Sequence, residues 1–231
     1  MTTVYTREVS IPTGGVLIDG DLRVPLRPRG LVVFAHGSGS SRFSRRNRYV
    51  AETLEGHGFA TLLLDLLTRE EEAVDVRTTE FRFDVERLGQ RVVAAIDWID
   101  THPAVMQLPI CCFGASTGAA AALIAAAARP DRVSAVVSRG GRPDLAGDAL
   151  AAVAAPTLLI VGGRDAQVVE LNRQALRRMH APARLEIVPG ATHLFEEPGA
   201  LDAVCRRALG WCTRHLVPRS EARMYARAEA E

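Results

Sequence analysis

The chain has 231 residues, of which 48% are hydrophobic and 24% charged, and its formal net charge is +1. This length suits one well-buried domain, and the nearly neutral balance gives no indication of nucleic-acid or anionic-membrane binding. All 28 basic residues are arginine, which excludes Schiff-base chemistry through a lysine and the usual anchorage of pyridoxal phosphate.

The N-terminal sequence and the cysteine spacing favour a protein in a reducing compartment. Residues 1–7 lack the charged and apolar regions of a signal peptide, and no apolar run reaches transmembrane length. We therefore expect a cytoplasmic protein, monomeric or homodimeric, that binds neither nucleic acid nor membrane. The four cysteines are predicted to be buried reduced thiols, because no Cys/His spacing matches a zinc pattern. No metal and no cofactor is predicted.

Apolar runs rich in β-formers alternate with helical patterns, which favours a mostly parallel sheet of about eight strands with helices on both faces. Residues 219–231 are predicted to be a charged tail after a single domain spanning 1–218. Charged residues 69–80 are expected to form a solvated loop or the start of a helix. The expected strands are 4–11, 16–24, 31–35, 60–65, 109–113, 133–137, 157–161 and 185–188, and the expected helices 46–57, 81–101, 117–128, 145–153, 168–179 and 201–216.

A G-x-S-x-G motif lies between a predicted strand and a predicted helix. It reads Gly114-Ala115-Ser116-Thr117-Gly118. A sharp strand-to-helix turn projects the serine oxygen above the sheet edge, and the helix directs its N–H groups toward a developing oxyanion. A glycine-rich turn with an incidental serine is the plain alternative. The strand–turn–helix setting favours Ser116 as a nucleophile.

A serine nucleophile needs a base, and the base needs an orienting acid. Asp165 follows the strand 157–161, and His193 follows the last predicted strand, so both belong at the same sheet edge in the order Ser, Asp, His. A helix-capping aspartate and a surface histidine are the alternatives. The other five histidines are weaker candidates, since His57 lies before a strand and three more lie at helix ends.

The loop after the strand 31–35 reads His36-Gly37-Ser38-Gly39-Ser40-Ser41. Acyl transfer needs two N–H donors on the oxyanion. We expect them to be the backbone N–H groups of Thr117 and Ser38. His36 is expected to order this loop through side-chain hydrogen bonds, with a direct acid–base or substrate-binding role as the alternative.

Arginines flank the predicted site. Arg139 follows the strand 133–137, and Arg42, Arg45 and Arg46 follow the glycine-rich loop. If Arg139 faces the cleft, its guanidinium could bind a substrate carboxylate bidentately. Solvation, or pairing with nearby Asp and Glu, is the alternative for all four arginines.

Together these motifs resemble those of the α/β-hydrolase superfamily, and within it the dienelactone hydrolase-like group. The resemblance covers roughly residues 4–216. Its strongest segments are 36–40, 114–118, 162–165 and 190–193. Dienelactone hydrolases proper carry a cysteine at the nucleophile position, where this chain has Ser116. Only residues 138–156 separate the strands between which the superfamily usually inserts a lid, so the resemblance implies a fairly open site.

The resemblance and the motifs lead to one functional prediction. We expect a serine hydrolase that cleaves a small carboxylic ester, lactone or thioester through an acyl-enzyme. One alternative is a ligand-binding protein that retains the triad on a hydrolase fold. Another is an acyltransferase or C–C hydrolase that uses the same three residues.

Overall fold

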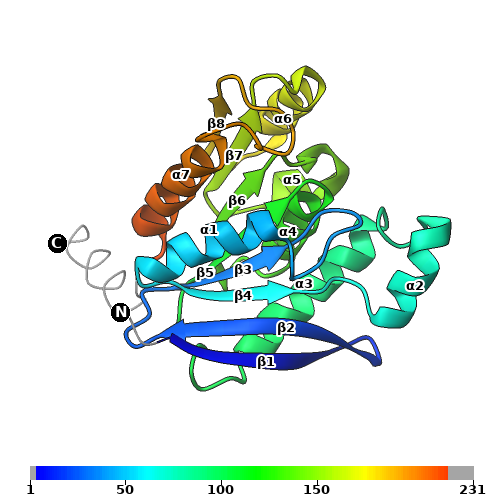
Figure 1. Ribbon diagram of the computed structural model, residues 1–231, viewed down its shortest axis with the longest axis vertical. Coiled ribbons are helices and arrows are strands. Elements are labelled where there is room, and N and C mark those ends of the chain that lie inside the picture. The colour runs from blue at the N-terminus through cyan, green and yellow to red at the C-terminus, as the bar shows by residue number, and fades with distance from the viewer. Residues whose placement is uncertain (1–3, 218–231) are drawn as a thin grey trace.

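The fold is known from a computed structural model, which describes residues 4–217. Eight strands form one sheet in the order β1-β2-β4-β3-β5-β6-β7-β8 (Figure 1). The first two strands form a hairpin, and β2 pairs antiparallel with β4; all other neighbours are parallel. The strands are β1 Val4–Thr13, β2 Val16–Pro25, β3 Leu31–Ala35, β4 Ala60–Leu64, β5 Ile110–Ala115, β6 Val133–Arg139, β7 Thr157–Gly162 and β8 Ala183–Val188.

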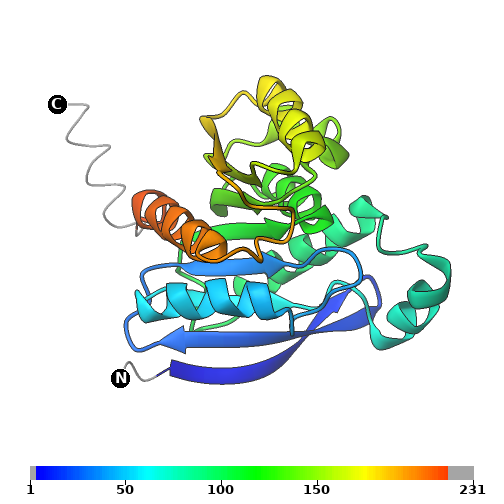
Figure 2. The same cartoon turned by 45° about the horizontal axis from the view of Figure 1, so that its top comes forward.

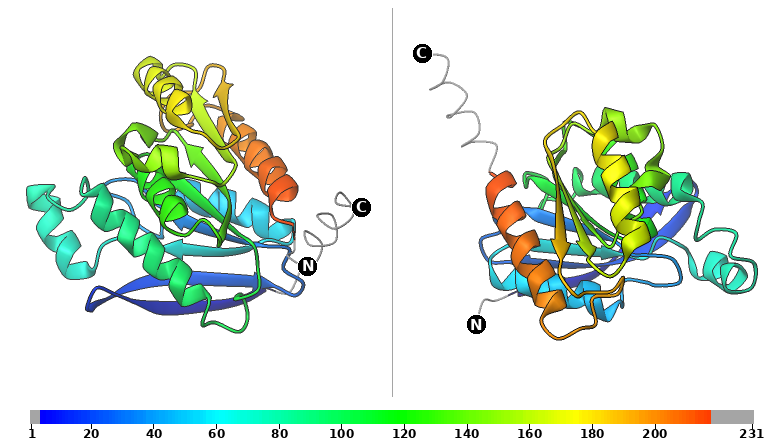
Figure 3. Two further views of the ribbon diagram at one scale, coloured as in Figure 1. Left: turned by 180° about the vertical axis from the view of Figure 1, so that it is seen from behind. Right: turned by 90° about the horizontal axis from the view of Figure 1, so that it is seen from above.

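Helices cover both faces of this sheet, as predicted (Figures 2 and 3). The helices α1 and α7 contact each other and share one buried cluster, while α3, α4 and α6 contribute to the cluster on the opposite face. The helices are α1 Arg45–Gly56, α2 Arg69–Thr78, α3 Val85–Ile99, α4 Thr117–Ala128, η1 Pro143–Ala146, α5 Ala149–Ala152, α6 Ala166–Arg178 and α7 Ala200–His215.

Between β6 and β7 the chain forms only the short helices η1 and α5. This is the place at which a lid was expected to be absent, and no substantial lid is found there. The helix α2 stands away from the body of the molecule, at the edge of the view in Figure 1. Within residues 4–217, every helix is too short or too polar to cross a membrane. The predicted charged tail, 219–231, lies outside the described residues.

Two helical predictions need correction. Residues 69–78 form the complete helix α2, because Thr68 and Glu71 make a reciprocal capping box. The helix predicted over 81–101 begins at Val85, because the Asp84 side chain accepts the N–H of Arg87 and caps it there. Phe81 therefore lies in the preceding turn. The helix predicted over 145–153 is divided at Gly147, which has a positive φ, into the short helices η1 and α5. The remaining elements agree with the predicted ones to within a few residues at their ends.

Candidate active site

Ser116 lies in the turn between β5 and α4. Its backbone has φ 51° and ψ −122°, a left-handed φ that non-glycine residues rarely adopt. Close packing holds the turn in place. A Cβ on Gly114 would lie 2.4 Å from the Ala119 Cα, and one on Gly118 would lie 2.3 Å from the carbonyl oxygen of Ala35. Both positions therefore require glycine, and the motif spacing follows from this contact.

Asp165 and His193 lie at the ends of β7 and β8, as the sequence predicted. Their side chains meet, with 2.6 Å between His193 Nδ1 and Asp165 Oδ2. Asp165 occupies the N-cap position of α6, yet its side chain makes no capping hydrogen bond. The carboxylate is directed to the imidazole, which argues against the capping alternative. The pair leaves Nε2 as the ring nitrogen available to a nucleophile.

Ser116 and His193 line one cavity of about 240 Å³. Between these two described side chains the structure has no hydrogen bond. Catalytic hydrogen bonds in ligand-free enzymes are often long and close only when substrate binds. The His193 loop is itself ordered, because Glu197 Oε1 accepts the backbone N–H of Thr192 at 3.0 Å. The arrangement can support proton transfer from Ser116 to His193 once that contact closes.

Thr117 and Ser38, the two expected oxyanion donors, contact each other. The backbone N–H of Ser38 donates to Thr117 Oγ1 at 2.9 Å, and the two hydroxyl oxygens are also 2.9 Å apart. From the sequence, the Ser38 N–H was expected to donate to the oxyanion. In the structure it already has an acceptor, so an oxyanion must replace Thr117 Oγ1 there. The N–H of Thr117 belongs to the first turn of α4 and has no acceptor within that helix.

His36 orders the loop, as expected. Its Nε2 accepts the backbone N–H of Leu66 at 3.0 Å, which assigns the ring proton to Nδ1, 2.9 Å from the carbonyl oxygen of Gly37. Burial lowers the pKa of His36, so the ring stays neutral. Both ring nitrogens are engaged within the protein. The alternative in which His36 binds substrate or exchanges protons therefore finds no support in this geometry.

Arg139 lines the same cavity as Ser116. It is 6% exposed, and its Nη2 donates to Asn47 Oδ1 at 3.2 Å. Its Nε is buried and has no hydrogen-bond partner among the described residues. Burial, and next the charge of Arg46, lower the pKa of Arg139 to about 10. A buried guanidinium beside a nucleophile, held by a neutral amide, agrees with the prediction that Arg139 faces the cleft.

The N-terminus of α1 also lines this cavity, through Ser44, Arg46 and Asn47. Arg46 was among the arginines expected to flank the site, but Ser44 and Asn47 were not predicted. The contact between Asn47 and Arg139 spans 92 residues of sequence, and no local pattern signals it. Arg42, in contrast, is paired with carboxylates, which was the alternative for the arginines of this loop.

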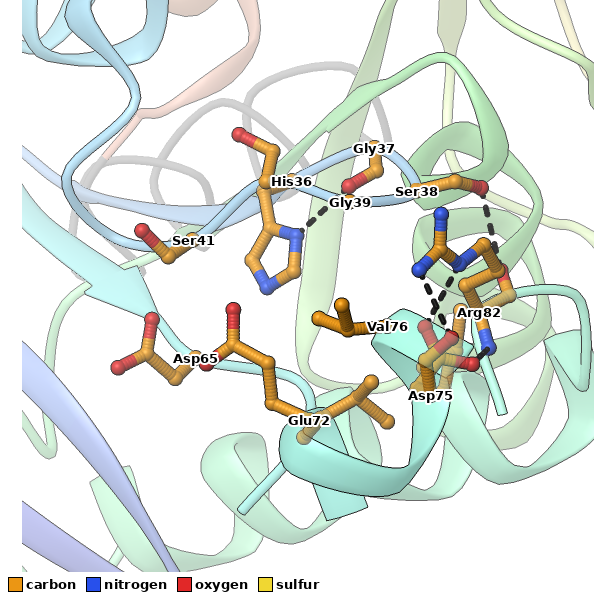
Figure 4. A pocket seen from close by; sticks show the side chains of 13 residues that line it. His36, Gly37, Ser38, Gly39, Ser41, Asp65, Glu72, Asp75, Val76 and Arg82 are labelled. Carbon is orange, nitrogen blue, oxygen red and sulfur yellow. Dashed lines mark hydrogen bonds and ion pairs between the residues drawn. The ribbon is translucent and has the colours of Figure 1, made fainter. Parts of the chain in front are cut away.

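A second cavity, of about 270 Å³, lies between the loop 36–41 and α2 (Figure 4). His36 faces Glu72 and Val76 across it. At one end the Nε of Arg82 donates to Asp75 Oδ2 at 2.6 Å, and the carbonyl oxygen of Arg82 accepts the Ser38 hydroxyl at 3.2 Å. Thr117, Ser38 and the 82 loop thus form one hydrogen-bond chain that links the nucleophile turn to this cavity.

The cysteines and acidic side chains suggest no other chemistry. All four cysteines are buried and free, and burial raises the pKa of Cys112 to about 12, so its thiol is a poor nucleophile. Within residues 4–217, no group of three or more His, Cys, Asp or Glu is placed to hold a metal ion.

A parallel sheet with a serine at its strand-to-helix elbow and a histidine–aspartate pair at the same edge defines an α/β-hydrolase. The dienelactone hydrolase family matches residues 18–211, and the chain belongs to that family of hydrolases. It is similar to a dienelactone hydrolase from Anabaena variabilis ATCC 29413 of known crystal structure. The two are 54% identical, with a TM-score of 0.90 over 92% of this chain and 99% of that one.

Two further likenesses are informative. The fold is shared with Est1E from Butyrivibrio proteoclasticus, at 18% identity and a TM-score of 0.75 over 90% of this chain and 98% of that one. The curated protein "Putative phosphoribosyl transferase Rv0571c" from Mycobacterium tuberculosis (strain H37Rv) is 58% identical over 209 residues. Those residues are 90% of this chain and 46% of that protein, so this chain spans about half the length of its curated relative.

Proposed function

We propose that this chain hydrolyses a small carboxylic ester, lactone or thioester through an acyl-enzyme on Ser116. The observation that carries the proposal is the position of Ser116 in its strained turn, in one cavity with a histidine that Asp165 orients. A serine is a weak nucleophile unless a base removes its proton, and this arrangement supplies the base.

In the proposed reaction Ser116 Oγ attacks the carbonyl carbon while its proton passes to His193 Nε2. Asp165 stabilises the imidazolium through Nδ1–H. The N–H groups of Thr117 and Ser38 stabilise the oxyanion, the latter by leaving Thr117 Oγ1. The tetrahedral intermediate then expels the alcohol or thiol, which takes the proton from His193. A water molecule repeats the sequence on the acyl-enzyme and releases the acid.

The curated relative's name describes phosphoribosyl transfer, but this chain matches less than half of that protein. The elbow serine and its histidine are suited to acyl chemistry, so we assign hydrolysis to this part of the sequence. Acyl transfer to an acceptor other than water, C–C hydrolysis and a ligand-binding role stay alternatives. The cytoplasmic location and the absence of a macromolecular partner stay predictions from the sequence.

The test is a panel of p-nitrophenyl esters with short and medium acyl chains, measured with the wild type and Ser116→Ala. A fluorophosphonate probe provides an independent readout, since it should label Ser116 of the wild type and leave the variant unlabelled. Hydrolysis that persists in Ser116→Ala, or labelling confined to a cysteine, would overturn the assignment.

A further inference from the structure

Two arginine side chains in the catalytic cavity retain unused hydrogen-bond donors. The Nε atoms of Arg139 and Arg46 are both buried and have no hydrogen-bond partner among the described residues. They come from different elements, β6 and α1, and both residues line the cavity that contains Ser116. Buried polar groups are nearly always paired, and an unpaired cationic donor is the costliest kind. Two such donors in one cavity indicate a ligand that supplies the acceptors.

The protein balances only part of the positive charge of this corner. Arg139 contacts the neutral Asn47, and the charge of Arg46 is among the causes that lower the pKa of Arg139. Arg46 reaches one carboxylate, the exposed Glu196, through Nη1 at 3.1 Å. A surface ion pair of that kind contributes little. An anion between the two guanidinium groups would relieve their repulsion.

The first turn of α1 adds to the same corner. The Asn47 N–H donates to Ser44 Oγ, which leaves the N–H groups of Arg45 and Arg46 without an acceptor inside the helix. No acidic residue occupies that turn to offset the helix dipole. Helix N-termini bind phosphate well for these two reasons. The corner therefore combines two guanidinium groups with the N-terminal turn of α1.

We propose that this corner binds a phosphate group of the substrate, so that Ser116 cleaves an acyl ester of a phosphorylated compound. The inference rests on the proposed hydrolysis for its chemistry, while phosphate binding itself does not depend on it. A phosphate monoester carries a charge of about −2 near pH 7 and three acceptor oxygens, which matches two guanidinium groups and a helix terminus. A single carboxylate would leave part of that charge and several donors unmatched.

The first experiment measures binding without catalysis. Inorganic phosphate is titrated calorimetrically into the wild type, Arg139→Met, Arg46→Met and the control Arg45→Met. Arg45 is exposed on the same helical turn, so its variant removes an equal charge outside the cavity. We expect affinity to fall about tenfold or more in the two cavity variants and to change little in the control. Equal affinity in all four proteins would overturn the site.

The second experiment compares three acetate esters that differ in one group: acetylglycerol, acetylglycerol phosphate and acetylglycerate. The wild type should prefer the phosphate ester by about tenfold or more in kcat/KM, and Arg139→Met should remove that preference. A preference for the carboxylate ester, or for none of the three, would overturn the phosphate assignment. If Arg139→Met fails to fold, Arg46→Met and Arg139→Lys carry the same comparison.

Failure of this inference can be separated from failure of the proposed hydrolysis. Fluorophosphonate labelling of Ser116 reports the nucleophile, and protection from labelling by inorganic phosphate reports the anion corner. Labelling without protection would retain the hydrolase and overturn the phosphate site. Phosphate binding that depends on Arg139, with no labelling, would retain the site and overturn the hydrolase.

Discussion

Two buried arginines near the glycine-rich loop differ in their surroundings. Arg42 is 5% exposed and forms ion pairs with Glu8, Asp19, Asp21 and Asp65, which draw together β1, β2 and the end of β4. Arg139 is 6% exposed, and among residues 4–217 its side chain has one hydrogen-bond partner, the amide of Asn47. Burial alone would lower both pKa values. Hydrogen bonding and charge from Asp65 raise that of Arg42, whereas that of Arg139 falls to about 10.

The difference separates a region that stabilises the fold from one that is prepared for a ligand. A buried cation with several carboxylates is neutralised within the protein. A buried cation without one costs stability unless a ligand arrives, and such costs concentrate at functional sites. We therefore expect variants in the catalytic cavity to change activity with little loss of stability. Variants of the Arg42 cluster should do the reverse.

The largest expected effect is on the nucleophile. Ser116→Ala should lower kcat/KM for ester hydrolysis by a factor of about 10⁴ or more, because the covalent route is lost. Its thermal midpoint should stay close to that of the wild type. Ester assays and thermal unfolding measure the two quantities, with Ser10→Ala on the exposed edge strand as the control. A large loss of stability in Ser116→Ala would contradict the separation of the two regions.

The next largest losses of activity are expected for variants of His193 and then of Asp165. His193→Ala is expected to lose nearly as much activity as Ser116→Ala, and Asp165→Asn about tenfold to a hundredfold less, because the three residues act as a unit. Activity should also fall on acidification, since an imidazolium cannot accept the Ser116 proton. Steady-state kinetics of the single and double variants test this. Additive losses in the double variant would argue against one shared mechanism.

The sequence predicted the three catalytic candidates because each depends on a local motif at a strand end. It also predicted the eight strands of the sheet, since apolar β-rich runs stand out between glycine and proline. It left residues 69–80 as a solvated loop or the start of a helix, because α2 has no strong apolar face and is marked instead by the Thr68–Glu71 capping box. It could not find Asn47 or the occupied N–H of Ser38, because both contacts depend on how distant segments pack.

Arg42 should matter to stability more than any residue of the cavity. Arg42→Met leaves four carboxylates close together without their cation, and we expect it to cost about 2–3 kcal/mol of unfolding free energy. Removing one partner of a fully buried ion pair costs about 3–5 kcal/mol. The expected cost is lower here because these carboxylates are partly solvated. Denaturant unfolding measures it, with Arg45→Met as the control. An unchanged midpoint would show that the cluster is not a stabilising element.

Arg139→Met should have the opposite effect on the unfolding free energy. Removing a buried charge without a counter-charge is expected to raise the unfolding free energy by about 1 kcal/mol. Burial lowers the pKa of Arg139 to about 10 in the folded protein, so the cost is fully present below about pH 10. It diminishes as the pH rises above that value. The gain should therefore be constant between pH 6 and 9, and a destabilised variant would indicate that the protein supplies a counter-charge for Arg139.

The smallest expected effect concerns Thr117, which contacts Ser38 of the glycine-rich loop. Thr117→Val keeps the shape of the side chain and removes the oxygen that accepts the Ser38 N–H. The hydroxyl chain from Thr117 through Ser38 to the Arg82 carbonyl holds the loop against the nucleophile turn. Without it we expect kcat to fall about threefold to tenfold with KM nearly unchanged, since the Ser38 N–H would be less well placed for the oxyanion.

A rise in kcat would instead mean that Thr117 Oγ1 competes with the oxyanion for this donor. Thr53→Val, at a half-buried position of α1 that lines neither cavity, is the matched control. Steady-state kinetics on one neutral ester distinguish the two outcomes. In Thr117→Val, kcat falls if the hydroxyl positions the Ser38 N–H, and kcat rises if the hydroxyl competes for it.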